Sequence, residues 1–147
     1  DAATGEPVWR RGVGLFETSA LTGAVVPHGD TLFVPLSSME VGAAANPEYP
    51  CCRSHGALLA LEASTGAVRW TSPMTPPAQP TGRNAVGVEQ WGPSGATVWS
   101  TPTVDAVRGL VYVGTGQNLS APATGTSDAI VAVDMQTGAH RWVYQGT

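Results

Sequence analysis

The chain has 147 residues, of which 42% are hydrophobic and only 12% are charged, and its net charge at pH 7 is −4. The length and apolar content are enough for one domain with a core, whereas the negative charge and the lack of a basic cluster argue against nucleic-acid binding. No apolar run is long enough to cross a membrane, and 18 glycines with 12 prolines favour short strands joined by many turns.

The predicted secondary structure is almost entirely β-strand, because no stretch shows the 3.6-residue periodicity of an amphipathic helix. Residues 10–30 form a connector that ends in a hairpin-type turn at His28–Asp30. Pro102 indicates that the expected strand containing it is an edge strand or has a bulge. In chain order, the expected strands cover residues 31–35, 57–61, 98–104, 110–113, 129–133 and 141–144, and the expected long loops cover residues 36–56, 72–96 and 114–127.

One pattern, acid-x-x-Thr-Gly-x-x-x-Trp, occurs at residues 1–9, 62–70 and 134–142. Thr-Gly is a turn signal, because Gly readily takes a positive φ where two strands reverse. The acid can accept hydrogen bonds from N–H groups of the turn, and the Trp is large enough to lie over a neighbouring unit. The copies begin at residues 1, 62 and 134, so they are 61 and 72 residues apart. Plain four-stranded propeller blades are shorter, roughly 40–50 residues, so each unit carries extra loop.

The repeat predicts an all-β fold: a β-propeller fragment of about two four-stranded antiparallel blades with flanking strands. All of residues 1–147 are expected to belong to this single propeller domain. A β-sandwich is the alternative, but it leaves the regularly spaced Trp unexplained. Because the chain starts inside one copy of the motif and ends soon after another, we expect a piece of a longer protein.

The only cysteines, Cys51 and Cys52, are adjacent. From the sequence alone, two free thiols and a strained small-ring disulfide are equally acceptable. The low charge and the all-β pattern favour an oxidising compartment, so we expect a periplasmic or secreted protein.

The repeated motif resembles the tryptophan-docking motif of the quinoprotein alcohol dehydrogenases, propellers that hold pyrroloquinoline quinone (PQQ) and Ca²⁺. Tyr-Pro-Cys-Cys at 49–52, Val-Trp-Ser-x-Pro-Thr at 98–103 and Gly-Thr-Gly-x-Asn at 114–118 are similar to the polyvinyl alcohol dehydrogenase branch. The resemblance implies oxidation of primary or secondary alcohols, including polyvinyl alcohol, by hydride transfer to PQQ. It also implies an electron acceptor such as a cytochrome c.

The same resemblance implies a metal site at Glu40 and Asn118. Glu40 ends a Ser-Ser-Met-Glu segment, and the family's Glu there is a Ca²⁺ ligand; carboxylate and amide oxygens suit a hard cation. The family pattern Gly-Thr-Gly-Asn is interrupted here by Gln117, so either Gln117 or Asn118 is the amide ligand. Asn118 is preferred because the family's ligand at this place is an asparagine, with its shorter side chain. The resemblance is compatible with a lanthanide in place of Ca²⁺.

For the cofactor, the resemblance implies that Trp99 forms the floor of the PQQ site and that Thr97 meets the cofactor's edge. A disulfide of Cys51 and Cys52 would cover the other face. The simpler alternative for Trp99 is a core residue. The family's catalytic base is an Asp expected beyond Thr147, so we assign no catalytic residue within the chain.

A non-catalytic propeller of the same repeat family, acting as a binding scaffold, is the alternative function. Such a scaffold shares the repeated Trp but has no need for Glu40, Trp99 and Asn118 together. If the chain belongs to an enzyme, we expect Glu40 and Asn118 to face one cleft, with Trp99 and the cysteine pair nearby.

Overall fold

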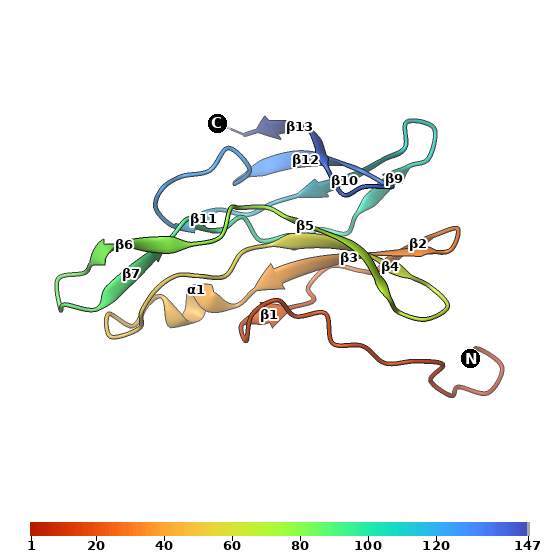
Figure 1. The fold of residues 1–147 in the computed structure, drawn as a ribbon, viewed down its shortest axis with the longest axis horizontal. Coiled ribbons are helices and arrows are strands. Elements are labelled where there is room, and N and C mark those ends of the chain that lie inside the picture. Colours follow the sequence, from red (N-terminus) through yellow and green to blue (C-terminus); the bar gives the residue numbers. More distant parts are fainter. Residues whose placement is uncertain (147) are drawn as a thin grey trace.

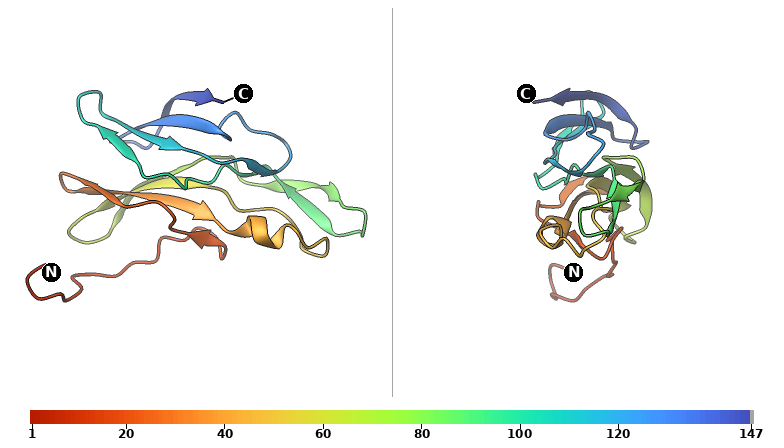
Figure 2. Two further views of the ribbon diagram at one scale, coloured as in Figure 1. Left: turned by 180° about the vertical axis from the view of Figure 1, so that it is seen from behind. Right: turned by 90° about the vertical axis from the view of Figure 1, so that its left-hand side faces the viewer.

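The computed structural model describes residues 1–146, whose strands form two antiparallel sheets stacked one above the other (Figures 1 and 2). The N-terminus lies below the first sheet and the C-terminus lies above the second. The first sheet contains β1 (Ser19–Ala20), β2 (Val26–His28), β3 (Thr31–Ser38), β4 (Ala57–Glu62) and β5 (Val68–Pro73). The second contains β9 (Thr103–Asp105), β10 (Leu110–Gly114), β12 (Ala129–Asp134) and β13 (His140–Gln145).

The remaining elements lie in the long connections. They are the hairpin of β6 (Gln79–Arg83) and β7 (Glu89–Gly92), the pair of β8 (Ser94–Gly95) and β11 (Asn118–Ser120), and one helical turn, α1 (Glu40–Ala43). Within residues 1–146, no helix has the length and apolar character that a membrane span requires.

The all-β prediction and the two four-stranded antiparallel units are confirmed. In each unit the strands follow one another as neighbours, β2–β3–β4–β5 in the first and β9–β10–β12–β13 in the second. Each of the two units ends in a hairpin built on one copy of the motif, β4–β5 at residues 62–70 and β12–β13 at residues 134–142.

Four local predictions were wrong. A strand was expected over residues 98–104, but only Thr103–Asp105 pairs as β9, because Pro102 has no N–H to donate to a ladder. The proline-rich stretch 72–96 was expected as loop, yet it contains the β6–β7 hairpin, with a register shift at Pro80. The stretch 114–127 was also expected as loop, yet it contains β11, which pairs with β8. Glu40 lies in α1 rather than in irregular loop.

Alternate residues of β3 and β4 point to opposite sides of the first sheet, and in these two strands both sides are buried because other parts of the chain cover them. Phe33 and Leu58 belong to a cluster shared with the second sheet, whereas Val34 and Leu59 pack with Trp9 of the N-terminal segment. The shared cluster consists of Phe33, Leu58, Ala60, Met74, Ala96, Val98, Val111, Val113, Ala129, Val131 and Val133. β4 therefore reads as a continuous apolar run rather than an alternating one.

The motif turns have the local chemistry that the sequence predicts. The Asp134 carboxylate accepts hydrogen bonds from the N–H groups of Gln136 (3.0 Å) and Thr137 (2.9 Å). Gly138 takes φ +74°, and the equivalent Gly66 takes φ +71°. The turn thus needs both the acid and the glycine.

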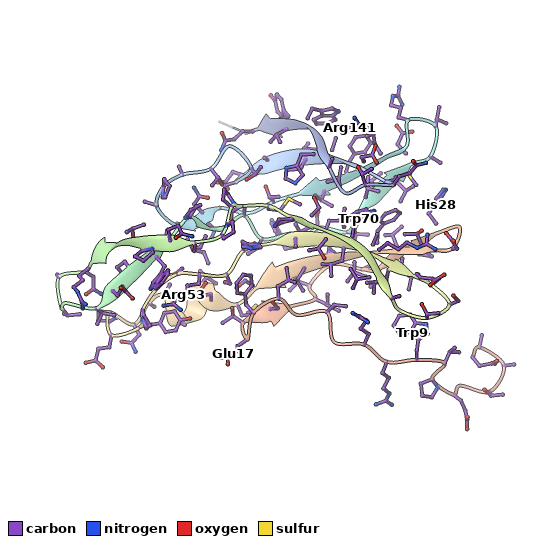
Figure 3. All side chains as sticks on the ribbon, viewed as in Figure 1. Trp9, Glu17, His28, Arg53, Trp70 and Arg141 are labelled. Carbon is purple, nitrogen blue, oxygen red and sulfur yellow. A yellow bond between two sulfur atoms is a disulfide. The ribbon has the colours of Figure 1, made fainter. Side chains whose placement is uncertain are left out.

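Each of the first two motif tryptophans contacts the next copy of the motif. A Cβ atom added at Gly66 would lie 2.7 Å from the Trp9 ring, and one added at Gly138 would lie 2.7 Å from the Trp70 ring. In Figure 3, Trp9 points from the N-terminal segment toward the first sheet, and Trp70 lies between the two sheets. Each indole also donates a hydrogen bond to the carbonyl that follows the next copy's acid, Trp9 to Ala63 at 2.9 Å and Trp70 to Met135 at 3.1 Å.

Candidate functional site

Three segments far apart in the sequence lie side by side at the end of the molecule that carries α1, β7 and β11 (Figure 1). They are the β3–β4 connection at residues 39–56, the stretch 91–98 and the stretch 115–120. Backbone hydrogen bonds join the first two: Gly95 N–H donates to the Ser54 carbonyl at 2.9 Å, and Gly56 N–H donates to the Gly95 carbonyl at 2.9 Å. Similar bonds of 2.9 Å join the last two, from Ala96 N–H to the Gln117 carbonyl and from Gly116 N–H to the Thr97 carbonyl.

Two glycines permit this close approach of the three segments. A Cβ at Gly56 would lie 2.2 Å from the Ala96 carbonyl oxygen, and a Cβ at Gly95 would lie 2.5 Å from the Gln117 carbonyl oxygen. Gly95 also has φ +98°, which a residue with a side chain rarely adopts. The layer of three segments is therefore possible only with glycine at these positions.

Glu40 is sealed beneath the loop that follows it. Its side chain is 2% exposed, and its carboxylate accepts five hydrogen bonds. The Tyr49 hydroxyl donates to Oε1 at 3.0 Å, and the Arg53 N–H donates to Oε1 at 2.9 Å and to Oε2 at 3.1 Å. Ser54 donates to Oε2 through its N–H at 2.7 Å and through its hydroxyl.

These donors decide the ionisation of Glu40. Burial by itself raises the pKa of this carboxyl, but the hydrogen bonds from Ser54, Arg53 and Tyr49 outweigh burial and hold the pKa below its ordinary value. Burial and the bond to Glu40 raise the pKa of the Tyr49 hydroxyl. Glu40 is therefore a charged acceptor, and Tyr49 is a neutral donor.

A row of hydroxyl groups continues behind Glu40. Ser54 Oγ lies 2.5 Å from Ser38 Oγ, which lies 3.1 Å from Thr18 Oγ1. Ser38 Oγ also accepts the Glu40 N–H at 3.1 Å. The row fixes the Ser54 side of the carboxylate to β3 and to the segment before β1.

A cleft of about 620 Å³ opens beside this carboxylate, lined by residues 14–18 together with Glu40, Tyr49, Arg53 and Ser54. The Arg53 guanidinium carbon lies 3.7 Å from the centre of the Trp91 ring, a cation–π contact. Figure 3 shows Arg53 near α1 and β7, with Glu17 on the side of the N-terminal segment. The cleft thus combines acidic, basic and aromatic groups.

Cys51 and Cys52 form a disulfide across a cis peptide bond, so the free-thiol alternative is wrong. Both cysteines are buried, at 8% and 0% exposure. The Trp91 N–H donates to the Cys51 carbonyl at 2.7 Å, and the Cys52 N–H donates to the Trp91 carbonyl at 3.2 Å. The disulfide therefore lies against the strand that carries Trp91.

Trp99 is 63% exposed, so the core alternative for this residue is wrong. Its indole and the Thr97 hydroxyl both border Gly116, where an added Cβ would lie 3.4 Å from Trp99 Nε1 and 3.0 Å from Thr97 Oγ1. Phe33 and Trp70, by contrast, pack against one another in the interior, with ring centres 5.9 Å apart. Trp99 thus presents a large aromatic surface to the outside of the three-segment layer.

Asn118 lies in β11, where it pairs with Gly95. Its Oδ1 accepts a hydrogen bond from the Thr124 hydroxyl at 3.1 Å, and it lines a cleft of about 300 Å³ to which Glu40 does not contribute. The side chain of Gln117 is exposed. Contrary to the expectation, Glu40 and Asn118 line different clefts, although both border the same three-segment layer.

Three contributors to the site were missed in the sequence: Tyr49, Ser54 and Trp91. Trp91 offered a signal, because only Trp91 and Trp99 of the five tryptophans lie outside the motif copies. Tyr49 and Ser54 offered none, since they reach Glu40 through folding of a long loop.

The two implied ligands fit these residues differently. An exposed indole such as Trp99 suits a planar quinone, which stacks on aromatic faces. A carboxylate has about four lone-pair sites, and the five hydrogen bonds onto Glu40 use them, so as arranged Glu40 has no free lone pair for a cation. Among residues 1–146, no three His, Cys, Asp or Glu side chains cluster as a metal site would require.

Comparison with known proteins identifies a matching family and two similar relatives. Residues 34–147 match the family described as the glucose/ethanol/alcohol dehydrogenase β-propeller domain. A polyvinyl alcohol dehydrogenase from a Pseudomonas species is 40% identical over 149 residues, and one from Sphingopyxis sp. (strain 113P3) is 38% identical over 148 residues. These alignments cover 100% and 99% of the chain but only 23% and 22% of the relatives, so the chain spans less than a quarter of their length.

Solved structures support the fold. Quinohemoprotein alcohol dehydrogenase ADHIIG from Pseudomonas putida HK5 superposes with a TM-score of 0.73 at 23% identity, over 100% of this chain and 23% of that one. The quinohemoprotein alcohol dehydrogenase of Comamonas testosteroni gives a TM-score of 0.69 at 24% identity, over 100% of this chain and 24% of that one. The arrangement of the two sheets is that of neighbouring propeller blades, and the sandwich alternative is wrong.

Proposed function

Because the chain belongs to the glucose/ethanol/alcohol dehydrogenase β-propeller family, we propose that it forms part of a PQQ-dependent alcohol dehydrogenase. The relatives named above are polyvinyl alcohol dehydrogenases, and their similarity runs along the whole chain. The proposed substrates are accordingly primary or secondary alcohols, polyvinyl alcohol among them. The proposed electron acceptor is a cytochrome c, and the proposed location is the periplasm or outside the cell.

The observation that carries the proposal is the exposed indole of Trp99. A tryptophan that is 63% exposed leaves most of its ring in water, which is costly unless something covers it. The backbone two residues before it is fixed by the 2.9 Å bond from Gly116 N–H to the Thr97 carbonyl, and the indole borders Gly116. An open aromatic face is what a planar cofactor needs for stacking.

Within this proposal, the chain's own residues bind and orient. Trp99 stacks on one face of the cofactor, Thr97 donates to its edge, and the Cys51–Cys52 disulfide covers the opposite face. The chemistry that PQQ would supply when bound is that of a hydride acceptor for the alcohol carbon. The proton acceptor is proposed to be an Asp beyond Thr147, which lies outside the described residues.

The family resemblance also implies a cation at Glu40 and Asn118, Ca²⁺ or a lanthanide, but these two residues line different clefts, so the observed arrangement offers no single site for the ion. Carboxylate and amide oxygens are the correct ligand types. Since the Glu40 oxygens already accept five hydrogen bonds, a cation would have to displace at least one donor.

The test is to measure PQQ binding to the longest natural polypeptide that contains this chain. Binding is monitored through quenching of tryptophan emission, and dye reduction by alcohols is the second readout. Trp99→Ala should lower PQQ affinity by roughly tenfold to a hundredfold, which corresponds to about 1–3 kcal/mol for a lost aromatic stack of this size. Trp142→Ala is the matched control, because Trp142 is also exposed, at 46%, but lies in β13 away from the site.

PQQ binding that is equally strong in Trp99→Ala would remove Trp99 from the site. An absence of both PQQ binding and dye reduction would instead support the alternative, a non-catalytic scaffold with the same fold.

A further inference from the structure

A second, smaller pocket shares Phe16 and Arg53 with the cleft beside Glu40. Its volume is about 230 Å³, several times the roughly 30 Å³ that one water molecule occupies in the liquid, so it can hold a small organic group. Four separate parts of the chain supply its lining, which consists of Phe16, Arg53, His55, Pro77, Ala78 and Trp91. None of the residues assigned above to the cofactor or to a cation lines this pocket.

His55 offers this pocket a hydrogen-bond acceptor. The residue is 8% exposed, and burial lowers its pKa, so the ring is neutral at pH 7. Nδ1 lies 3.0 Å from the Gly56 carbonyl oxygen, which can only accept, so Nδ1 carries the proton and Nε2 has a free lone pair. Within residues 1–146, Nε2 has no partner, and the buried side-chain atoms without one are only Ser72 Oγ and Trp91 Nε1. Nε2 is therefore accessible to a ligand in the pocket, while the Phe16 ring packs edge-on against the imidazole with the ring centres 4.9 Å apart.

Arg53 adds hydrogen-bond donors to the same pocket. Its guanidinium carbon lies 3.7 Å from the centre of the Trp91 ring, and none of the ion pairs within residues 1–146 includes Arg53. A guanidinium carries five N–H donors and no acceptor. The contact with Trp91 restrains the side chain, so a ligand that uses these donors loses less side-chain entropy. The pocket thus combines available donors with an available acceptor.

These polar groups select among ligand chemistries. A carboxylate would satisfy Arg53 but would place its acceptor oxygens against the acceptor Nε2 of His55. An ammonium group would satisfy Nε2 but would be repelled by the Arg53 charge. A hydroxyl both accepts and donates, so a single alcohol group can accept from Arg53 and donate to His55. The apolar walls, among them Phe16, Pro77 and Trp91, suit the CH₂ groups beside such a hydroxyl.

From this geometry we infer that the pocket of Arg53, His55 and Trp91 is a hydroxyl-recognition subsite, which holds an alcohol group of a polyol other than the one that reacts. The choice of an alcohol as the ligand rests on the proposed function. Polyvinyl alcohol carries a hydroxyl on every second carbon, with CH₂ groups between, so it matches both the polar groups and the apolar walls. A monohydric alcohol that places its hydroxyl at the reacting position has no second hydroxyl for the subsite.

The experiment compares the KM for polyvinyl alcohol with the KM for pentan-2-ol, which has one hydroxyl. Dye reduction is measured with the longest natural polypeptide that contains this chain, loaded with PQQ. In His55→Phe, which removes the acceptor, the KM for polyvinyl alcohol should rise about twofold to tenfold, because one hydrogen bond between neutral groups is lost. In Arg53→Leu it should rise about tenfold or more, because the lost donor is charged. In both variants kcat and the KM for pentan-2-ol should stay as in wild type.

Three further variants separate recognition from general damage to the fold. His55→Gln keeps an acceptor near the position of Nε2 and should stay close to wild type. His140 is exposed in β13 and lines a different cleft, so His140→Phe should leave both KM values unchanged. Arg83 lies in the neighbouring β6–β7 hairpin and donates to the Gly87 carbonyl at 2.6 Å, so Arg83→Leu removes a nearby positive charge without touching the pocket.

A binding measurement gives a second readout that needs no turnover. Saturation-transfer NMR with a short vinyl alcohol oligomer and the PQQ-free polypeptide should show binding by wild type and weaker binding by His55→Phe and Arg53→Leu. Equal oligomer binding by all three proteins would overturn the inference. A loss of PQQ affinity in the two variants, with oligomer binding unchanged, would also overturn it, because the pocket would then serve the cofactor. If wild type reduces no dye with either alcohol, the proposed function fails, and oligomer binding still decides the subsite.

Discussion

Substitution of Gly138 by alanine tests whether the contact between one motif and the next stabilises the fold. Gly138 has φ +74°, and a Cβ there would lie 2.7 Å from Cε3 and 2.8 Å from Cδ2 of Trp70. Ordinary contacts of this kind begin at about 3.4 Å, so the Trp70 ring must move by several tenths of an ångström or more. The movement also strains the 3.1 Å bond from Trp70 Nε1 to the Met135 carbonyl.

The expected loss in free energy of unfolding has two separable parts. An alanine with positive φ costs about 1–2 kcal/mol by itself, and overpacking with partial loss of the indole bond adds about 1–3 kcal/mol. Gly109 supplies the matched control, because it has φ +67° and no atom within 4 Å of an added Cβ. Gly109→Ala should therefore cost only the first part.

The assay is urea unfolding followed by circular dichroism, which avoids changes in tryptophan emission caused by the substitution itself. We expect the free energy of unfolding to fall by about 2–5 kcal/mol in Gly138→Ala and by about 1–2 kcal/mol in Gly109→Ala. Equal losses in the two variants would refute the reasoning, because the Trp70 contact would then contribute nothing beyond backbone strain.

Three further predictions concern the site and the core. Gly116→Ala should weaken PQQ quenching severalfold without unfolding the protein, because the new Cβ would lie only 3.0 Å from Thr97 Oγ1 and would touch Trp99 at 3.4 Å; unchanged quenching would contradict this placement. Burial lowers the pKa of His55, so its neutral form stabilises the fold; that stability is complete above the unfolded pKa of about 6.5 and is lost as pH falls toward the folded value. The slope of unfolding free energy between pH 7 and pH 5 should accordingly be smaller in His55→Gln than in wild type, and equal slopes would exclude His55 as its source. Met74 is 1% exposed in the core between the sheets, so Met74→Ala should lower the free energy of unfolding by about 2–5 kcal/mol. A loss under about 1 kcal/mol would mean that neighbouring side chains fill the cavity.

The parts of the fold that the sequence predicts well are those with local causes. β4 and β12 were expected within one residue of their observed ends, because each is a short apolar run that stops at a motif acid, Glu62 or Asp134. The turn that follows each run depends on an acid and a glycine a few residues apart, so it too is encoded locally.

The parts that were missed depend on distant partners. The β6–β7 hairpin lies in a proline-rich stretch that reads as loop, and its pairing tolerates Pro80 only through a register shift. α1 has four residues, too few to show helical periodicity. The Glu40 carboxylate takes its backbone donors from Arg53 and Ser54, at separations of 13 and 14 residues, and no local pattern predicts such contacts.

The repeat explains why the site residues converge and why they are not equivalent. Glu40 follows the end of β3 at Ser38, and Asn118 follows the end of β10 at Gly114, so both come after the second strand of their four-stranded unit. The two units place them at the same end of the molecule, but the connection after β3 is long enough to fold back and cover its acid. The connection after β10 leaves Asn118 with a single side-chain acceptor bond, from Thr124. The extra length of the first loop therefore gives Glu40 a second set of partners, and these come from that insertion rather than from the repeat itself.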